Sequence, residues 1–178
     1  MALALRERLQ PFALRATDGT IVTPEQFAGA AVLGVIFWCN HCPYVKAWED
    51  RIIALQRAYA DRGVQFVLIN SNDPIAYPDD SFEAMQRRAR EKQYPFPYLV
   101  DETQEVARRY GATRTPEVFL FDRNRELRYH GAPDDNVEDP AAVRAHYLRD
   151  AIDALLAGRD PEPAETPPRG CTIKWRTG

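Results

Sequence analysis

The chain has 178 residues, 45% of them hydrophobic, which suffices for one well-buried core and favours a single domain. A formal net charge of -3 and the lack of a lysine- or arginine-rich block argue against a nucleic-acid partner. The N-terminal stretch MALALRERLQPF has no sustained apolar run, and no later stretch approaches membrane-spanning length, so we expect a cytoplasmic protein without a membrane partner. Three cysteines are too few for a disulfide framework, and in a reducing compartment they favour catalysis or metal binding.

The first predicted elements lead to a buried strand. The dipeptide Asp18-Gly19 suits a tight turn and predicts a hairpin between segments 12–16 and 20–23. A helix of one or two turns is expected to begin at Pro24, a favoured first helical residue. The apolar run Val32–Trp38 is rich in β-branched and aromatic residues and predicts a strand buried on both faces.

Two cysteines, Cys39 and Cys42, follow this strand at the start of a predicted amphipathic helix that ends before Gly63. The helix is indicated by apolar residues at helical spacing: Val45, Trp48, Ile52, Leu55 and Tyr59. Unpaired backbone N–H groups and the positive end of the helix dipole stabilise a thiolate at such a junction. The position and the residue type therefore both indicate thiol chemistry.

The next segments alternate strand and helix. Residues 64–70 predict a second buried strand, and the loop that follows ends in Asp80, which with Glu83 is expected to cap a helix reaching about residue 92. A short strand at 97–100 precedes a helix that starts within the sequence DETQ and ends before Gly111.

The last predicted elements are a hairpin, a helix and a tail. The segment EVFLF after Thr115-Pro116 and the segment 126–130 predict an antiparallel pair of strands. Asp139-Pro140 is expected to start a long amphipathic helix that Gly158 ends, and the proline-rich tail beyond it is expected to be extended. Strands that alternate with helices imply an α/β fold with a mainly parallel sheet, covered on both faces and completed by an antiparallel hairpin.

The motif WCNHC after a buried strand, together with RTPEVFLF downstream, resembles the thioredoxin fold, and specifically the redoxin branch that includes peroxiredoxins and TlpA-like proteins. The segments INSND, YLVDETQEVA, GAPDDN and GCTIKW resemble a group of bacterial redoxin proteins over nearly the whole chain. The resemblance implies a central mixed β-sheet flanked by helices, with an N-terminal hairpin extension and an inserted helix and strand. We assign residues 1–158 to a thioredoxin-like redoxin domain and residues 159–178 to a proline-rich tail that carries Cys171.

The predicted activity is thiol-disulfide exchange by Cys39 and Cys42, without a cofactor or a metal. Because the first sulfur of a CxxC motif is usually exposed, we expect Cys39 to attack and the less accessible Cys42 to resolve the mixed disulfide. We expect His41, between them, to lower the pKa of Cys39 and make the pair more oxidising, as the resemblance to CPHC sites suggests. The partners would be a protein dithiol or disulfide, or a peroxide, and a thiol electron donor.

Three further residues are assigned to substrate binding: Thr115, Pro116 and Asn40. The resemblance implies a cis Pro116 lying against the cysteines, with the backbone of Thr115 offered to an extended peptide. The strand 31–38 contains no acid, so it lacks the buried carboxylate that many thioredoxins use to accept the proton of the second cysteine.

Several alternatives remain open at this level. The Cys42-Pro43 dipeptide resembles the peroxidatic Cys-Pro of peroxiredoxins, which makes a thiol peroxidase, with Cys42 or Cys39 as the peroxidatic cysteine, the enzymatic rival; a non-catalytic thioredoxin-fold interaction module is the third reading. Cys39, His41, Cys42 and Cys171 also have the side-chain types of a zinc site. Cys171 is either an additional redox thiol or an idle thiol anchored by its apolar neighbours Ile173 and Trp175.

Overall fold

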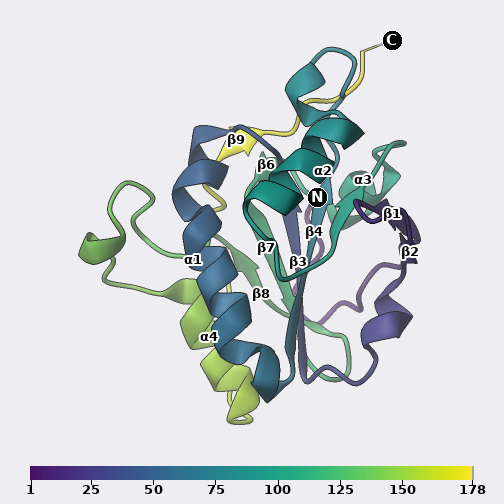
Figure 1. The fold of residues 1–178 in the computed structure, drawn as a ribbon. Coiled ribbons are helices and arrows are strands. Elements are labelled where there is room, and N and C mark those ends of the chain that lie inside the picture. Colours follow the sequence, from purple (N-terminus) through teal and green to yellow (C-terminus); the bar gives the residue numbers. More distant parts are fainter. Residues whose placement is uncertain (178) are drawn as a thin grey trace.

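The computed structural model describes residues 1–177 and is built around the strand β3 (Val32–Trp38). All seven residues of β3 are buried, because the strand has a parallel neighbour on one side, β4 (Val64–Asn70), an antiparallel neighbour on the other, β7 (Glu117–Phe121), and apolar packing on both faces. The apolar run in the sequence therefore becomes an interior strand of the sheet (Figure 1).

The main sheet has seven strands in the order β2-β1-β5-β4-β3-β7-β8. The remaining strands are β1 (Leu14–Ala16), β2 (Ile21–Val22), β5 (Tyr98–Val100) and β8 (Leu127–Gly131). The strands β3, β4 and β5 are parallel, and the pairs β1–β2, β1–β5, β3–β7 and β7–β8 are antiparallel. The predicted mixed sheet with an N-terminal hairpin is thereby confirmed. The expectation of a mainly parallel sheet is wrong, because four of the six strand pairings are antiparallel: the hairpin joins the sheet through an antiparallel β1–β5 pair, and β7 runs antiparallel to β3.

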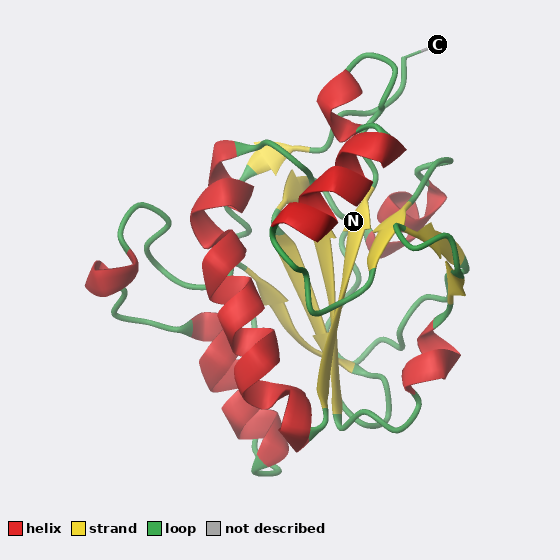
Figure 2. Ribbon diagram, viewed as in Figure 1, coloured by secondary structure: helices red, strands yellow, loops and turns green. Residues whose placement is uncertain are grey.

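Helices cover both faces of this sheet (Figure 2). The helices α1 (Pro43–Tyr59), α2 (Phe82–Glu91) and α4 (Tyr147–Leu156) contribute apolar side chains to one core, and α3 (Glu105–Tyr110) packs with N-terminal residues in the core on the other face. In the described residues 1–177, no helix is both long and apolar enough to cross a membrane.

The start of α4 differs from the prediction. Asp139 caps only a short 3₁₀ turn over Pro140–Ala142, and the chain then leaves helical geometry at Val143. The carboxylate of Asp135 accepts a hydrogen bond from the backbone N–H of Arg144, which holds this connection as a loop. The helix therefore begins at Tyr147 rather than after Asp139.

The start of α2 also corrects the prediction, because Ser81 and not Asp80 caps this helix. The Ser81 hydroxyl accepts a hydrogen bond from the backbone N–H of Ala84. Asp80 is buried and directs its carboxylate toward the loop that contains the cysteines. An acid that the sequence pattern assigned to local helix capping thus takes part in the candidate site.

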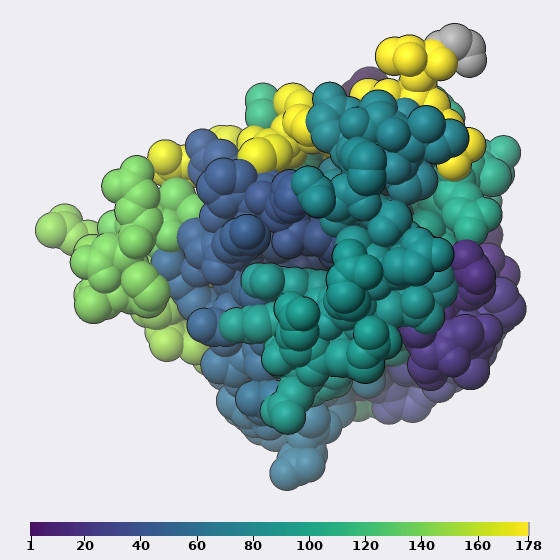
Figure 3. Space-filling view, turned by 45° about the horizontal axis from the view of Figure 1, so that its top comes forward, coloured from purple at the N-terminus to yellow at the C-terminus, as the bar shows by residue number. Residues whose placement is uncertain are grey.

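The C-terminal tail forms a second, two-stranded sheet with the middle of the chain. The strand β9 (Cys171–Thr172) pairs antiparallel with β6 (Arg114–Thr115), the segment just before Pro116. Figure 3 shows the tail, in yellow, running across one end of the molecule beside the start of α1 in blue. The tail thus crosses the end of the sheet at which the chain passes from β3 to α1.

Candidate functional site

The two cysteines of the CNHC motif lie in the loop between β3 and α1, and both are buried. Cys42 is the N-cap residue of α1, and Pro43 occupies its first turn. Cys39 is 3% exposed and Cys42 is 7% exposed. The expectation of an exposed Cys39 is wrong, because the side chain of Thr115 lies against its sulfur, with 3.4 Å between Cys39 Sγ and Thr115 Oγ1.

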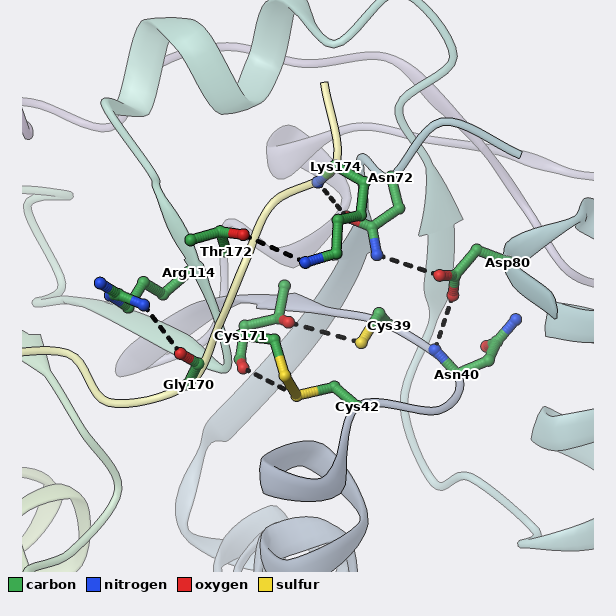
Figure 4. The surroundings of a disulfide bond; sticks show 11 residues. Cys39, Asn40, Cys42, Asn72, Asp80, Arg114, Gly170, Cys171, Thr172 and Lys174 are labelled. Atoms are coloured by element: carbon green, nitrogen blue, oxygen red, sulfur yellow. Dashed lines mark hydrogen bonds between the residues drawn. A yellow bond between two sulfur atoms is a disulfide. The ribbon is translucent and has the colours of Figure 1, made fainter. Parts of the chain in front are cut away.

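Cys42 forms a disulfide with Cys171, which is 129 positions away in the sequence (Figure 4). The Cα atoms of the pair are 6.2 Å apart, and Cys39 keeps a free thiol. The sulfur of Cys42 also lies 3.6 Å from the backbone oxygen of Thr115. Cys42 is therefore the sulfur at which the CNHC loop and the tail meet.

The segment before Pro116 carries the strand that holds Cys171. The Thr115–Pro116 peptide bond is cis, as the sequence resemblance implied, and Thr115 pairs directly with Cys171 in the β6–β9 ladder. The Arg114 guanidinium donates a hydrogen bond to the backbone oxygen of Gly170 at 3.0 Å. Of the three residues assigned to substrate binding, Thr115 and Pro116 lie at the cysteines, with the peptide edge of Thr115 occupied by the chain itself.

Beyond Cys171, the tail is anchored by one apolar side chain and by backbone hydrogen bonds. Ile173 is buried in the core on the α3 face, and its N–H donates to the backbone oxygen of Thr113. The N–H of Lys174 donates to the side chain of Asn72, and the backbone oxygen of Lys174 accepts from the side chain of Gln104. The tail thus binds the segment before Pro116, the loop after β4 and the residue before α3.

A buried carboxylate, Asp80, connects the cysteine loop with this tail. One of its oxygens accepts from the backbone N–H of Asn40 at 2.8 Å and from the side-chain amide of Asn70 at 3.1 Å. The other accepts from the side-chain amide of Asn72 at 3.0 Å, and Asn72 in turn accepts from Lys174 (Figure 4). One carboxylate therefore helps to fix the loop, the end of β4 and the tail.

The side chain of Asn40 faces the interior. Its amide oxygen accepts from the hydroxyl of Tyr98 at 2.7 Å, and its amide nitrogen donates to the backbone oxygen of Asp79 at 2.8 Å. Because both polar atoms are used within the protein, Asn40 positions the loop rather than presenting its side chain to a substrate.

The electrostatics at Cys39 correct the expectation that its thiol is acidic. Burial raises the pKa of Cys39, and the negative charge of Asp80 raises it further, which outweighs hydrogen bonds from Thr115 and from the backbone of Cys42 and His41. The imidazole of His41 lies 3.0 Å from the carboxylate of Asp79 and is 40% exposed, so the ring is engaged at the surface. The predicted net lowering of the Cys39 pKa is therefore wrong, and His41 acts on this thiol through its backbone N–H rather than through its imidazole.

A second buried acid, Glu117, follows Pro116 and binds the backbone of the segment that precedes this proline. The carboxylate of Glu117 accepts from the backbone N–H groups of Thr113 and Arg114 and lies 2.6 Å from His130 Nε2. Burial opposes the charge on His130, but the hydrogen bond and attraction to Glu117, with a smaller contribution from Glu165 in the tail, raise its pKa. This ion pair supports the loop before Pro116 from below.

Sequence reasoning missed the Asp80 cluster, although a signal for it was present. Asn70 ends β4, and Asn72 follows in the loop, next to the end of β3 where the cysteines begin. Because parallel neighbouring strands end at the same edge of a sheet, the polar sequence NSND was placed to meet the CNHC loop. Asn, Ser and Asp are also common turn formers, so this stretch has an ordinary explanation as a surface loop.

In the part of the chain that the structure describes, no group of three or more His, Cys, Asp or Glu side chains is arranged to hold a metal ion. Cys42 and Cys171, two of the side chains considered for zinc, are joined to each other. The arrangement of the sulfurs is therefore suited to disulfide exchange.

Comparisons with known proteins give the family context of this geometry. A family model described as Redoxin matches residues 5–145. An uncharacterized conserved protein from Geobacillus kaustophilus is 43% identical, with a TM-score of 0.93 over 98% of this chain and 94% of that one. The hypothetical protein SMc02350 from Sinorhizobium meliloti 1021 is 37% identical, with a TM-score of 0.94 over 100% of this chain and 98% of that one.

A more distant solved structure shares the fold. It is a thiol:disulfide interchange protein of the thioredoxin family from Chlorobium tepidum TLS, 18% identical, with a TM-score of 0.67 over 86% of this chain and 99% of that one. No curated protein matches the sequence. The similarity to the Sinorhizobium protein spans the tail as well as the cysteine loop.

Proposed function

Because the chain belongs to the Redoxin family, we propose that it is a thiol-disulfide oxidoreductase that acts on protein thiols through Cys39 and Cys42. One observation carries the proposal: Cys42 is joined to a cysteine whose strand pairs with the residue before the cis Pro116. A mixed disulfide with an extended peptide needs the same two contacts: Thr115 pairs with the peptide backbone, and Cys42 bonds to the sulfur of the peptide.

In this proposal Cys42 makes the mixed disulfide and Cys39 resolves it, which reverses the roles expected from the sequence. The thiolate of Cys42 attacks a partner disulfide, and one partner sulfur leaves as a thiolate. Cys39, once deprotonated, attacks Cys42 Sγ and releases the second partner thiolate, so that two electrons pass to the partner and a Cys39–Cys42 disulfide remains. The position of Cys42 at the N-terminus of α1 and the raised pKa of Cys39 support this order, because the thiolate is the attacking form.

An external dithiol donor completes the cycle by reducing the Cys39–Cys42 disulfide and becoming oxidised itself. In the structure Cys171 holds Cys42 in a second disulfide that the same donor can reduce. Thiolate attack by Cys171 on the Cys39–Cys42 bond would convert one disulfide into the other without a net transfer of electrons.

Peroxide reduction is a second candidate, favoured by the position of Cys42 at the N-terminus of α1, directly before Pro43, and by its bond to a distant thiol. The thiolate of Cys42 would attack the peroxide, forming a sulfenic acid and releasing an alcohol or water after protonation. Attack by the thiolate of Cys171 or Cys39 would then displace hydroxide, which leaves as water, and form a disulfide.

Two assays on matched variants test both candidates: insulin-disulfide reduction and peroxide consumption for the wild type, Cys39→Ser, Cys42→Ser and Cys171→Ser. The oxidoreductase proposal expects insulin reduction in the wild type and in Cys171→Ser and its loss in Cys42→Ser. Peroxide consumption without insulin reduction would favour the peroxidase. If the wild type shows neither activity, the result would favour a non-catalytic interaction module.

A further inference from the structure

We propose that the edge of β6, from Arg114 to Thr115, is a docking site for a partner segment of the form glycine, cysteine, any residue, aliphatic residue, and that residues 170–173 of the chain's own tail are its resident, displaceable occupant. This inference rests on the proposed function, since it names the class of protein thiol that the site accepts. The tail has this pattern itself, in the sequence Gly170-Cys171-Thr172-Ile173.

The docked tail closes the site to a second peptide. Cys42 is 7% exposed and Cys39 is 3% exposed, and the paired edge of Thr115 is already used by Cys171. Thiol-disulfide exchange needs direct contact between the attacking sulfur and the attacked one. A protein partner can therefore reach Cys42 on the β6 edge only by taking the place of β9.

The contacts of Gly170 set the requirement for glycine before the cysteine. A Cβ atom at position 170 would lie 2.1 Å from the backbone oxygen of Thr115, a distance at which atoms cannot coexist without a shift of the backbone. The guanidinium of Arg114 binds the backbone oxygen of the same residue. The site thus recognises the backbone at this position and excludes a side chain.

The position two residues after the cysteine requires an aliphatic side chain. Ile173 is 3% exposed and packs in the core on the α3 face, and its N–H binds the backbone oxygen of Thr113. Thr172, between Cys171 and Ile173, is exposed and faces no such restriction. By comparison with the tail, we expect the protein to select the partner residues at the positions of Gly170 and Ile173 and to accept any residue at the position of Thr172.

An earlier part of the tail is anchored separately, so β9 can leave without it. The N–H of His130 donates to the backbone oxygen of Ala164, and the N–H of Thr166 donates to the backbone oxygen of His130. The side chain of Thr166 also binds Tyr129, another residue of β8. Displacement of residues 170–174 therefore leaves residues 164–166 attached to the sheet as the hinge of the resident strand.

The exchange step balances without a further reactant. A partner thiolate attacks Cys42 Sγ, the Cys42–Cys171 bond breaks, and Cys171 leaves as a thiolate with the electron pair. A second thiolate of the partner then attacks the partner sulfur bound to Cys42, which releases the Cys42 thiolate. The partner dithiol becomes a disulfide, and the protein disulfide becomes two thiols.

The test uses a synthetic peptide with the tail sequence RGCTIKW, its cysteine activated as a mixed disulfide with thionitrobenzoate. The protein is full-length Cys39→Ser/Cys171→Ser, in which Cys42 is the remaining thiol. Attack by Cys42 joins the peptide to the protein and releases thionitrobenzoate, which is coloured. A second peptide, with valine in place of its glycine, measures the requirement for glycine.

Two further substitutions in this background compare a protein in which β9 stays docked on β6 (seated) with one in which β9 is displaced (unseated). Ile173→Asp places a charge in the apolar site and unseats β9, whereas Thr172→Asp adds the same charge at the neighbouring exposed position. Ile173→Ala is the milder second variant in case Ile173→Asp does not fold, which circular dichroism monitors. We expect the glycine peptide to react at least about tenfold faster with the Ile173 variant than with the Thr172 variant, a difference of about 1.4 kcal/mol.

With the strand unseated, we also expect the glycine peptide to react at least about tenfold faster than the valine peptide. Equal rates for the two peptides, or equal rates with seated and unseated strands, would overturn the inference. Dithiobis-nitrobenzoate, a small disulfide, separates this outcome from a failure of the proposed function. If Cys42 reacts with it but does not discriminate between the peptides, only the inference fails; if Cys42 does not react with it even in the unseated variant, the proposed function fails.

Discussion

The CNHC loop and the C-terminal tail each bring a cysteine to the same end of the sheet, but they are held there differently. The loop is continuous with β3 and α1, and a buried carboxylate, Asp80, binds its backbone at Asn40. The tail strand is two residues long, pairs with an equally short β6, and depends on the burial of Ile173. Cys42 therefore has one neighbour, Cys39, that is fixed within the same loop, and another, Cys171, that a short strand brings to it and that our proposal treats as displaceable.

The largest effect is expected from removing the sulfur that both regions share. Cys42→Ser eliminates the atom that bonds to Cys171 and that Cys39 would attack, so we expect disulfide exchange to fall by at least ~10³-fold. The measurement is the rate of insulin-disulfide reduction, with Cys171→Ser as the matched control because it leaves the Cys39–Cys42 pair intact. A Cys42→Ser variant that keeps most of the wild-type rate would remove Cys42 from the centre of the comparison.

The anchoring of the tail is tested by Ile173→Ala. Truncating a buried isoleucine to alanine costs about 2–5 kcal/mol, and here we expect the cost to fall on the docking of the tail. Hydrogen exchange of the Lys174 amide, which binds Asn72, reports this opening. We expect the protection of this amide to fall while amides in β3 keep theirs. An equal loss in both places would show that the tail and the sheet unfold as one unit.

The anchoring of the loop is tested by Asp80→Asn, which removes the charge and one acceptor while keeping the shape. We expect a loss of about 1–3 kcal/mol in the free energy of unfolding, because buried donors of Asn40, Asn70 and Asn72 lose good partners. Since the charge of Asp80 raises the pKa of Cys39, the substitution should also lower that pKa.

The pH profile of Cys39 alkylation measures this shift in the protein that carries the Cys42–Cys171 disulfide, where Cys39 is the free thiol. We expect the midpoint pH of the wild-type profile to be higher than that of an ordinary cysteine, and the midpoint for Asp80→Asn to be lower than that of the wild type. Ser81→Ala, which removes the helix cap next to Asp80, is the control for a general disturbance of this segment. Identical profiles for the wild type and Asp80→Asn would mean that Asp80 positions the loop without acting on Cys39.

The smallest expected effect is a pH dependence from His130, which supports the segment before Pro116. Its pKa is raised in the folded protein, mainly by Glu117 acting against burial, so its contribution is complete below the unfolded pKa of about 6.5 and is lost as the pH rises through the higher folded pKa. Urea unfolding across this range should show the free energy of unfolding falling with pH by less than ~1.4 kcal/mol per unit. His130→Gln should flatten that slope, and an unchanged slope would assign it to another group.

Local pattern was enough to predict the loop region. The apolar run that became β3, the periodic helix α1 and the cysteines at their junction all follow from neighbours in sequence, and the cis Pro116 followed from the family resemblance. These features depend on short stretches whose hydrophobic period and end residues are visible directly.

The tail and the Asp80 cluster could not be predicted in the same way, because they depend on contacts between distant segments. Nothing in the sequence GCTIKW alone shows that Cys171 pairs with Thr115 or that Ile173 completes a core on the α3 face. Asp80 matched a local capping pattern, but Ser81 next to it took that role and left the carboxylate for the loop. The raised pKa of Cys39 follows from its burial beside Thr115 and from the charge of Asp80, which are also contacts between distant segments.

Disulfide mapping of the oxidised wild-type protein by mass spectrometry tests the central claim most directly. The claim is that Cys42 bonds to a tail cysteine held on the edge of β6. We predict a cross-linked peptide that joins Cys42 to Cys171, with Cys39 recovered as a free thiol in that species. A map that shows only a Cys39–Cys42 bridge, with Cys171 entirely reduced, would contradict the account.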